Sequence, residues 1–484
     1  MGVRNTIRFL RCGKTVVLHD VPPTRTLLDY LRLEERSRGT KEGCNEGDCG
    51  ACTVVLGTLG NGRVNYEAVN ACILLLGQID GKELVTVDDL ARDGALHPVQ
   101  QAMVDFHASQ CGFCTPGFVM SLFALSHRGE AAGRAEVLDA IAGNLCRCTG
   151  YRPIIDAALH ACDGHQSDQW GTQETAQLLQ ALADDADILI GNDASFFAAP
   201  ASADALAELA AAHPDATILA GSTDVGLWIT KQMRALPKII HIGRVKALHE
   251  IVETENTLTI GAAATYAEAA AHLQALSPNA GEVLRRIGSA QVRASGTVGG
   301  NIANGSPIGD MPPMLIALDA TLTLRHGASE RSLPLENFFI AYGKQDRKPG
   351  ELVWRIDVPK LKANERFFAF KLSKRFDQDI SAVMAAFKFT LAGDRIASAR
   401  VAFGGMAATP KRASQTEAAL AGVSLSNAAS WGAAVQALAR DFQPIGDMRA
   451  SAAYRIEAAG GLLRRALLEC AGHAPAQTRI RVPA

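Results

Sequence analysis

The first 88 residues alternate between apolar and polar positions in the way that a small sheet requires. A Cys-Gly-Lys sequence separates the first two apolar runs and is typical of a hairpin turn. Residues 26–32 place three leucines on one face, which predicts a helix. Strands wrapped around one helix predict a compact α+β domain over residues 1–88. The strands are predicted at residues 6–11, 15–20, 53–56, 63–66 and 83–87.

The period of the apolar positions then changes from two to that of a helix. Three of the four predicted helices begin with a proline in the first turn, where its missing N–H costs nothing. Four short helices predict a bundle, which we assign to residues 89–165. The helices are predicted at residues 98–107, 115–128, 134–142 and 153–161.

The rest of the chain is predicted to form a linker and two further domains. Residues 166–192 are polar and rich in Gln, Asp and Ser, which favours a linker with one helical patch. A mixed α/β domain is expected over residues 193–362. The final domain, residues 363–484, begins with strands at 367–372, 382–391 and 396–403 and ends in helices. The fold class is therefore multidomain α+β.

Composition and charge exclude several classes of protein. The chain has 484 residues, of which 48% are hydrophobic and 20% charged, and its net charge is −2. No dense basic run offers a nucleic-acid footprint, and no apolar run approaches the roughly 18 residues that a membrane span needs. The N-terminus lacks the continuous apolar stretch of a signal peptide. We expect a cytoplasmic protein that binds neither nucleic acid nor membrane.

Eleven cysteines change this picture, because eight of them lie in two groups of four within the first third of the chain. The first group, Cys44, Cys49, Cys52 and Cys72, has the spacing C-x4-C-x2-C followed by a later cysteine. That spacing matches the plant-type 2Fe–2S pattern. Glycines at 43, 47 and 50 allow the backbone to approach sulfur closely. A structural zinc site is the alternative, although zinc motifs more often pair two C-x2-C knuckles.

The second group combines a C-x2-C pair with a later C-x-C pair. Taken alone, this spacing fits either zinc or an iron–sulfur cluster. Its members are Cys111, Cys114, Cys146 and Cys148.

Two glycine-rich loops stand out in the middle of the chain. The first is Leu219-Ala220-Gly221-Ser222-Thr223-Asp224-Val225-Gly226, which follows an apolar run and offers N–H groups and hydroxyls to a phosphate. The second spans residues 296–301 and 306–310, and five glycines lie between residues 296 and 309. Either loop could instead be an ordinary connection without a ligand. No G-x-G-x-x-G sequence occurs, so a Rossmann nucleotide site has no support.

Three stretches resemble the cluster signatures of the molybdenum hydroxylases, the xanthine dehydrogenase and aldehyde oxidase family. They are EGCNEGDCGACTV at residues 42–54, QCGFCTPG at 110–117 and GNLCRCTGYRPI at 143–154. The resemblance implies a ferredoxin-like β-grasp domain and a four-helix domain, each holding a 2Fe–2S cluster on one cysteine quartet. It also implies that Gln110 lies near the pterin of a molybdenum cofactor.

The glycine loops resemble the FAD-binding domain of the same family, which is a non-Rossmann α/β fold. The resemblance implies that residues 219–226 wrap the pyrophosphate of FAD. It places further contacts at Ile287, Thr297, Gly300, Asn301 and Asp310. The stretch FKLSKRFDQDISAV at residues 370–383 resembles the start of the family's flavoprotein C-terminal domain and implies that Ile380 lies near the flavin. No catalytic acid or base is nominated in this chain.

The order of the parts resembles the small, iron–sulfur and FAD subunit of two-subunit bacterial xanthine dehydrogenases. The resemblance implies a large molybdopterin-binding partner, in a heterotetramer of two small and two large subunits. Electrons from hypoxanthine or xanthine oxidation to urate would pass through two clusters to FAD and then to NAD. Another molybdenum hydroxylase, acting on an aldehyde or an N-heterocycle, and a free-standing iron–sulfur flavoprotein reductase are the alternatives.

Overall fold

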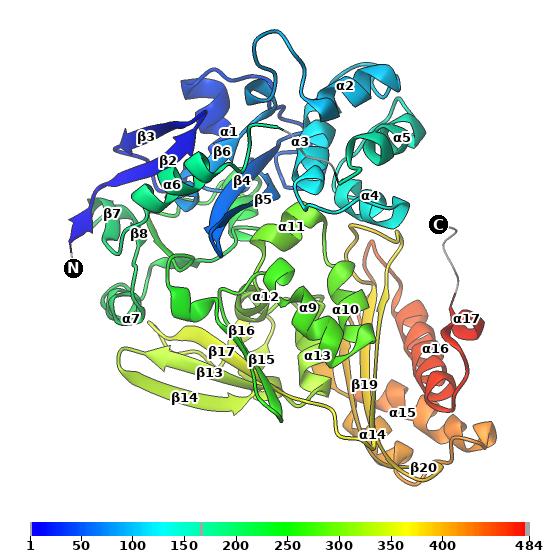
Figure 1. The fold of residues 1–484 in the computed structure, drawn as a ribbon. Coiled ribbons are helices and arrows are strands. Elements are labelled where there is room, and N and C mark those ends of the chain that lie inside the picture. The colour runs from blue at the N-terminus through cyan, green and yellow to red at the C-terminus, as the bar shows by residue number, and fades with distance from the viewer. Residues whose placement is uncertain (1, 165–167, 480–484) are drawn as a thin grey trace. The chain divides into compact units, whose positions relative to one another are not determined.

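The computed structural model describes residues 2–164 and 168–479, which divide into two compact units. The first unit comprises residues up to 246 together with 288–296, and the second comprises 247–287 and the residues from 297 onward. Figure 1 colours the chain from the N-terminus to the C-terminus. Over the described ranges, no helix is both long enough and apolar enough to cross a membrane.

The N-terminal part of the first unit is a five-stranded sheet in the order β3-β2-β6-β4-β5. Cys12 and Gly13 both have positive φ, so they form the hairpin turn predicted between the first two strands. The predicted helix is only one turn, α1 (Leu27–Asp29), and continues as a wider π-type turn over Tyr30–Glu34. The strands are β2 (Thr6–Arg11), β3 (Lys14–His19), β4 (Thr53–Gly60), β5 (Arg63–Asn70) and β6 (Glu83–Val85).

Four helices follow the sheet, as the spacing predicts (Figure 1). A proline occupies the first or second position of three of them. Helix α3 (Thr115–Ser126) is buried on all sides along residues 117–126, which places it at the centre of this bundle. The four are α2 (Pro98–Asp105), α3 (Thr115–Ser126), α4 (Arg134–Ile141) and α5 (Arg152–Ala161).

A second sheet completes the first unit, in the order β1-β7-β8-β10-β9. Strand β1 pairs in parallel with β7, so the N-terminus of the chain joins a sheet formed by residues after position 186. Helix α6 and strand β7 both lie in the segment between residues 166 and 192. The elements are β1 (Val3–Arg4), α6 (Gln173–Leu182), β7 (Asp187–Asn192), β8 (Ser195–Ala199), α7 (Ala203–Ala212), β9 (Thr217–Leu219), α8 (Val225–Thr230), β10 (Lys238–His241) and α11 (Ala290–Ser295).

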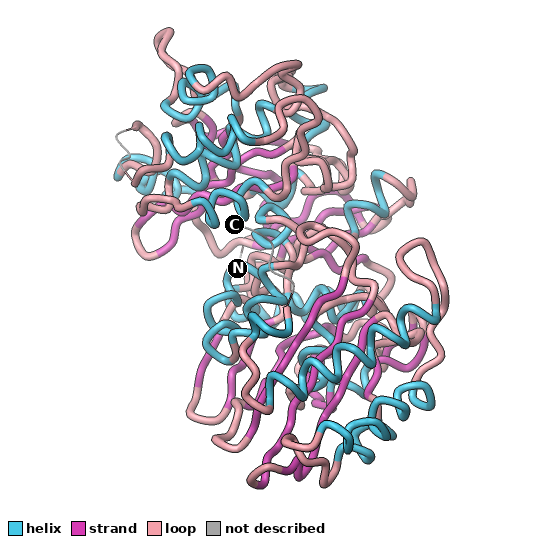
Figure 2. The backbone as a smooth tube through the Cα atoms, turned by 90° about the vertical axis from the view of Figure 1, so that its right-hand side faces the viewer, coloured by secondary structure: helices cyan, strands magenta, loops and turns pink. Residues whose placement is uncertain are grey.

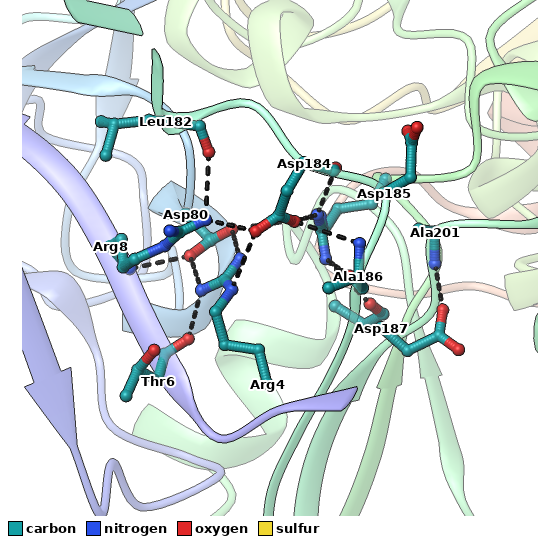
Figure 3. Close-up of polar contacts among 12 residues, drawn as sticks. Arg4, Thr6, Arg8, Asp80, Leu182, Asp184, Asp185, Ala186, Asp187 and Ala201 are labelled. Carbon is teal, nitrogen blue, oxygen red and sulfur yellow. Dashed lines mark hydrogen bonds and ion pairs between the residues drawn. The ribbon is translucent and has the colours of Figure 1, made fainter. Parts of the chain in front are cut away.

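Ion pairs tie this second sheet to the first (Figure 3). Arg4 makes two hydrogen bonds to Asp80, at 2.8 and 2.7 Å, and its Nε lies 3.2 Å from Asp184. Arg8 also pairs with Asp184, and Arg244 Nη2 lies 2.8 Å from the other carboxylate oxygen. Burial opposes the charge on Asp184, but these guanidinium groups outweigh it and lower the pKa of the carboxyl group.

The second unit contains a five-stranded sheet, a four-stranded antiparallel sheet and a two-stranded ribbon. The five-stranded sheet has the order β11-β12-β17-β13-β14 and the four-stranded sheet the order β18-β19-β20-β21. The strands are β11 (Ile251–Glu253), β12 (Thr257–Gly261), β13 (Thr321–His326), β14 (Ser329–Pro334), β15 (Phe339–Ala341), β16 (Lys344–Gln345), β17 (Leu352–Pro359), β18 (Glu365–Leu372), β19 (Val383–Ala392), β20 (Arg395–Gly404) and β21 (Lys411–Arg412).

Helices cover the long strands of the four-stranded sheet, which Figure 2 shows in magenta. Val383, Phe387 and Phe389 share one face of β19 and pack with Leu438 and Leu463 from two of these helices. This is the succession of strands and then helices predicted for the last domain. The helices of the second unit are α9 (Tyr266–Leu276), α10 (Pro278–Arg285), α12 (Val298–Asn304), α13 (Met311–Ala317), α14 (Ser414–Leu420), α15 (Gly432–Asp441), α16 (Ala452–Cys470) and α17 (Pro475–Thr478).

Candidate functional site: two cysteine loops and two glycine loops

The first cysteine quartet lies at one end of the N-terminal sheet. Cys44, Cys49 and Cys52 belong to the loop that leads into β4, and Cys72 follows the end of β5. Because β4 and β5 are antiparallel neighbours, the start of one and the end of the other meet at the same edge of the sheet. Cys52 and Cys72 are buried, whereas Cys44 and Cys49 are partly exposed.

Backbone N–H groups of this loop point at the sulfur atoms. Cys44 Sγ accepts from the amides of residues 46, 48 and 49 at 3.3–3.4 Å, and Cys72 Sγ accepts from Gly47 at 3.3 Å. Hydrogen bonding from Cys49 and Cys72 lowers the pKa of the Cys44 thiol, and the contact with Cys44 raises the pKa of its two partners. Crowded thiols resist joint ionisation unless a cation lies among them, so this set of donors fits a bound metal cluster.

The glycines of this loop serve the two purposes expected of them. Gly47 and Gly50 have φ values of +76° and +67°, which side chains rarely adopt. Gly43 has an ordinary φ, but a Cβ there would lie 2.7 Å from Cys49 Sγ. Bare backbone is therefore needed at all three positions.

The second quartet lies at the helix ends of the bundle. Cys114 is the N-cap of α3, and Cys146 and Cys148 lie in the turn that precedes α5. Cys111 and Cys148 are exposed. Burial raises the pKa of Cys114 to about 12, helped by the nearby Cys146. This site is open to the surroundings of the molecule.

Tyr151 and Thr149 organise the turn around Cys146. The Cys146 N–H donates to the Tyr151 hydroxyl at 2.9 Å, and the Thr149 hydroxyl lies 3.2 Å from Cys146 Sγ. Tyr151 has a φ of +68°, and its own N–H is held by Thr149 Oγ1 at 3.1 Å. Burial opposes ionisation of Cys146, but the Thr149 contacts outweigh it and lower the pKa of the thiol.

The two cysteine loops are joined directly by backbone. The N–H of Leu145, next to Cys146, donates to the carbonyl oxygen of Cys49 at 3.0 Å. Asn144 Nδ2 donates to the carbonyl of Gly50 at 3.1 Å. Within residues 2–164 and 168–479, no three Cys, His, Asp or Glu side chains converge on a single-ion position. A two-iron cluster needs only two of four thiolates on each iron.

The first glycine loop follows β9 in the first unit. Residues 219–226 run from the end of that strand into α8. Gly221 has no room for a side chain, because a Cβ would lie 1.8 Å from the carbonyl oxygen of Ser295. Ser222 has a φ of +63°, and its buried hydroxyl has no partner among the described residues. A buried, unpaired hydroxyl on a strained loop fits a polar ligand.

The second glycine loop begins α12 in the second unit. Thr297 is its N-cap and accepts from the N–H of Gly300 at 2.9 Å. A Cβ on Gly299 would lie 2.5 Å from the carbonyl of Ala262, so the helix starts in close contact with its neighbour. Asn301 Oδ1 is buried and lacks a partner in the part of the chain that the structure describes. This loop therefore also carries a polar atom suited to a ligand.

Asp310 lies beside the second loop and is buried. Its carboxylate accepts from Lys371 Nζ and from the Ser381 hydroxyl, each at 2.5 Å. Ile287 is buried, whereas Ile380 is 48% exposed. The structure thus brings Asp310 next to residue 381, and it holds the two glycine loops in different units.

Four family models match consecutive parts of the chain. They are the 2Fe-2S iron-sulfur cluster binding domain over residues 9–75, the 2Fe-2S binding domain over 86–159, the FAD binding domain in molybdopterin dehydrogenase over 192–361 and the CO dehydrogenase flavoprotein C-terminal domain over 368–470. This order is the domain layout of the iron–sulfur and flavin part of a molybdenum hydroxylase. The chain belongs to the molybdenum hydroxylase family.

Several molybdenum hydroxylases are similar over most of the chain. A xanthine dehydrogenase of Emericella nidulans is 32% identical over 90% of this chain, and xanthine dehydrogenase 2 of Arabidopsis thaliana is 30% identical over 85%. The chain spans only 36% of the length of either relative.

Solved structures resemble a little over half of the chain. The carbon monoxide dehydrogenase of Hydrogenophaga pseudoflava, in a form that lacks the Mo-pyranopterin moiety, has 29% identity and a TM-score of 0.53, covering 56% of this chain and 95% of that one. Quinoline 2-oxidoreductase of Pseudomonas putida 86 has 26% identity and a TM-score of 0.51, with the same two coverages.

The structure places at these sites several polar residues that carry no ligand motif in the sequence. Lys231 bonds to the carbonyl of Cys44, and its Nζ lies 3.6 Å from Glu46. Gln291 and Asn144 lie between the two cysteine loops. Lys231 and Gln291 are far from the cysteines in sequence, whereas Asn144 lies inside the second motif but is not a sulfur ligand. The one available signal for Gln291 is its place in a polar stretch just before the second glycine loop.

Proposed function

We propose that this chain is the electron-transfer part of a xanthine dehydrogenase, passing electrons from a molybdenum cofactor on a partner subunit to FAD and then to NAD. The observation that carries the proposal is the backbone contact between the two cysteine loops, Leu145 N–H to Cys49 C=O. It joins two cluster-binding domains within the unit that also holds the first glycine loop. When bound, the clusters carry single electrons and the flavin delivers a hydride.

Each quartet supplies the ligands of one 2Fe–2S cluster in this proposal. Three sulfur atoms of the first quartet, those of Cys44, Cys49 and Cys72, accept backbone N–H groups, which stabilise the negative charge of a thiolate-bound cluster. In the second site, Cys111 and Cys148 are exposed, whereas no cysteine of the first quartet is fully exposed. The ligands are Cys44, Cys49, Cys52 and Cys72 for the first cluster and Cys111, Cys114, Cys146 and Cys148 for the second.

The glycine loops supply the FAD contacts. The unpaired Ser222 hydroxyl and Asn301 amide oxygen support this role, because each is a buried polar atom without a partner among the described residues. Gly221 and Gly299 let each loop pack closely on neighbouring backbone, which holds these polar atoms in place. The proposed contacts are residues 219–226 with Ile287, Thr297, Gly300, Asn301, Asp310 and Ile380.

The partner subunit is expected to cover the second cysteine loop. Cys111 and Cys148 are exposed there, and Phe113 and Leu145 beside them are 49% and 41% exposed. Apolar side chains next to exposed ligands are typical of a surface that a partner covers. Gln110, also exposed, would reach toward the molybdopterin. We propose an assembly of two such chains with two large molybdopterin-binding subunits.

Xanthine is the proposed substrate of the assembly because the similar full-length relatives are xanthine dehydrogenases. A second candidate is another molybdenum hydroxylase, acting on a different substrate. The similarity to carbon monoxide dehydrogenase and quinoline 2-oxidoreductase structures supports that candidate. The choice depends on residues of the partner subunit.

The test is an anaerobic absorption spectrum of the native complex before and after xanthine is added. The proposal expects flavin and iron–sulfur bands that bleach with xanthine and recover when NAD is added. Bands that bleach only with quinoline or an aldehyde would support the second candidate. A colourless preparation containing zinc would contradict both, since zinc has no visible bands.

A further inference from the structure

A buried amide connects the two cysteine loops to helix α11. Gln291 lies on α11 in the first unit and is 1% exposed. Its Nε2 donates to Thr53 Oγ1 at 3.2 Å, to Ser121 Oγ at 3.1 Å and to Asn144 Oδ1 at 3.1 Å. Thr53 follows the first cysteine loop, and Asn144 precedes the second, so one amide group spans both.

The hydrogen-bond directions around this amide are fully determined. Thr53 Oγ1 donates to the carbonyl of Gly50 at 2.6 Å, and Ser121 Oγ donates to Asn144 Oδ1 at 2.7 Å. All three atoms that face Gln291 are therefore acceptors, and only its NH₂ end can satisfy them. Its Oε1, by contrast, has no partner in the described ranges. The NH₂ group has two hydrogens for these three acceptors, so one hydrogen is shared, and the buried Oε1 is left unpaired on the other side.

The amide holds the contact between the cysteine loops. Asn144, which Gln291 orients, donates to the carbonyl of Gly50, and the next residue donates its N–H to the carbonyl of Cys49. The two cysteine loops are closely packed at this contact, without room for a side chain at Gly50 or Gly143. A Cβ on Gly50 would lie 2.1 Å from the carbonyl of Gly143, and a Cβ on Gly143 would lie 2.2 Å from Gln291 Oε1.

We propose that Gln291 is a positioning residue for electron transfer between the two cluster sites. It acts by keeping the Leu145 N–H on the carbonyl of Cys49, which is the shortest covalent and hydrogen-bonded connection between the two cysteine loops. This inference rests on the proposed function, since it requires a cluster on each quartet. One electron leaves the reduced second site and reduces the first, and no bond forms or breaks.

A packing role alone would be shared with the other anchor of α11. Arg293 Nη2 pairs with Asp139 on α4 at 2.7 Å. The variant Arg293→Met weakens the attachment of α11 without touching the amide. Gln291→Met keeps the shape of the side chain and removes its donors. Gln101→Met, on the exposed face of α2, is the surface control.

The measurement is electron paramagnetic resonance of each purified holoprotein after full reduction with dithionite, together with the rate of electron equilibration after rapid partial reduction. We expect Gln291→Met to keep the wild-type iron content, to show a smaller magnetic splitting between the clusters and to equilibrate about tenfold more slowly. Ser121→Ala removes one acceptor with little change in volume. It should reduce the magnetic splitting and the equilibration rate as well, but less than Gln291→Met does. Arg293→Met should lower the melting temperature and leave the splitting unchanged.

Three results would overturn the inference. A wild-type splitting and rate in an iron-replete Gln291→Met protein would remove the positioning role. If Gln291→Met does not fold, unchanged signals in Ser121→Ala would do the same. Equal changes in Arg293→Met and Gln291→Met would assign the effect to α11 as a whole. Wild-type protein that binds no iron would instead overturn the proposed function, and this inference with it.

Discussion

The two cysteine quartets hold the same number of sulfur atoms in opposite surroundings. In the first loop Cys52 and Cys72 are buried, and backbone N–H groups point at sulfur from several positions. In the second, Cys111 and Cys148 are exposed. The first loop lies at one edge of the N-terminal sheet. The second group lies at the N-terminal ends of helices α3 and α5. Under the proposed function, the first site would exchange electrons within the chain and the second with the partner subunit.

The largest expected effect comes from removing a buried ligand. Cys72→Ser should lose about half of the bound iron and also lower the melting temperature, because a polar hydroxyl then replaces a buried sulfur beside the first loop. Cys148→Ser should lose a similar share of iron but little thermal stability, since that position is exposed. Iron analysis and thermal unfolding check both. Equal losses of stability in the two variants would contradict the comparison.

A second test uses one glycine from each loop. Gly50→Ala should lower the free energy of unfolding by about 3 kcal/mol, because its Cβ would lie 2.1 Å from the carbonyl of Gly143 at a φ of +67°. Gly112→Ala, at a φ of +83° with no atom within 4 Å, should cost only about 1 kcal/mol of backbone strain. Urea unfolding measures both. A costlier Gly112 variant would mean that the second loop is the more tightly packed one.

Asp168 binds two histidines of the helical domain. Its carboxylate oxygens lie 2.8 Å from His97 Nε2 and 3.3 Å from His127 Nε2. Burial opposes the charge on Asp168, but these contacts outweigh it and lower its pKa well below the usual value of 3.8. A lowered pKa stabilises the fold above about pH 4, and the contribution is lost as the pH falls toward the depressed value.

Asp168→Asn should therefore cost about 1 kcal/mol near pH 7, with the difference from wild type shrinking below about pH 4. Thermal unfolding across this range measures it. The matched variant is Asp184→Asn, whose partners are arginines rather than histidines (Figure 3). A difference that grows toward acid pH would contradict the assignment.

The smallest effect is expected at the turn before α5. Tyr151→Phe removes the hydroxyl that accepts from the Cys146 N–H and should cost about 1 kcal/mol. It should shift the reduction potential of the second cluster and leave that of the first unchanged. The reason is that the Tyr151 hydroxyl accepts a hydrogen bond from the backbone N–H of Cys146, a proposed ligand of the second cluster. Redox titration followed by paramagnetic resonance separates the two signals. Tyr454→Phe, on the exposed side of α16, is the control.

Local chemistry made part of this fold predictable. Prolines in the first turn predicted the starts of α2, α3 and α5, and the first hairpin was predicted from its Cys-Gly turn. The helix expected at residues 26–32 was less well predicted, because its apolar face packs on the sheet while the backbone widens into a π-type turn. Propensity predicts that an element exists, and tertiary packing decides its geometry.

The polar residues around the sites could not be predicted in this way. Gln291 lies more than one hundred residues from each of the groups that it contacts, and nothing near it in sequence resembles a ligand motif. Lys371 likewise meets Asp310 across 61 positions of the chain. Such contacts arise from packing between elements, and periodicity contains no information about them.

The cysteine spacings predicted the sulfur ligands of the two proposed cluster sites, because such ligands recur at definite spacings with glycines where sulfur meets backbone. Changes of period along the chain predicted the succession of strands and helices. The spacings did not predict that two cysteines of the first quartet are buried and two of the second exposed, or that a glutamine from a distant helix lies between the loops. Burial depends on which elements pack together, and that is a property of the folded chain as a whole.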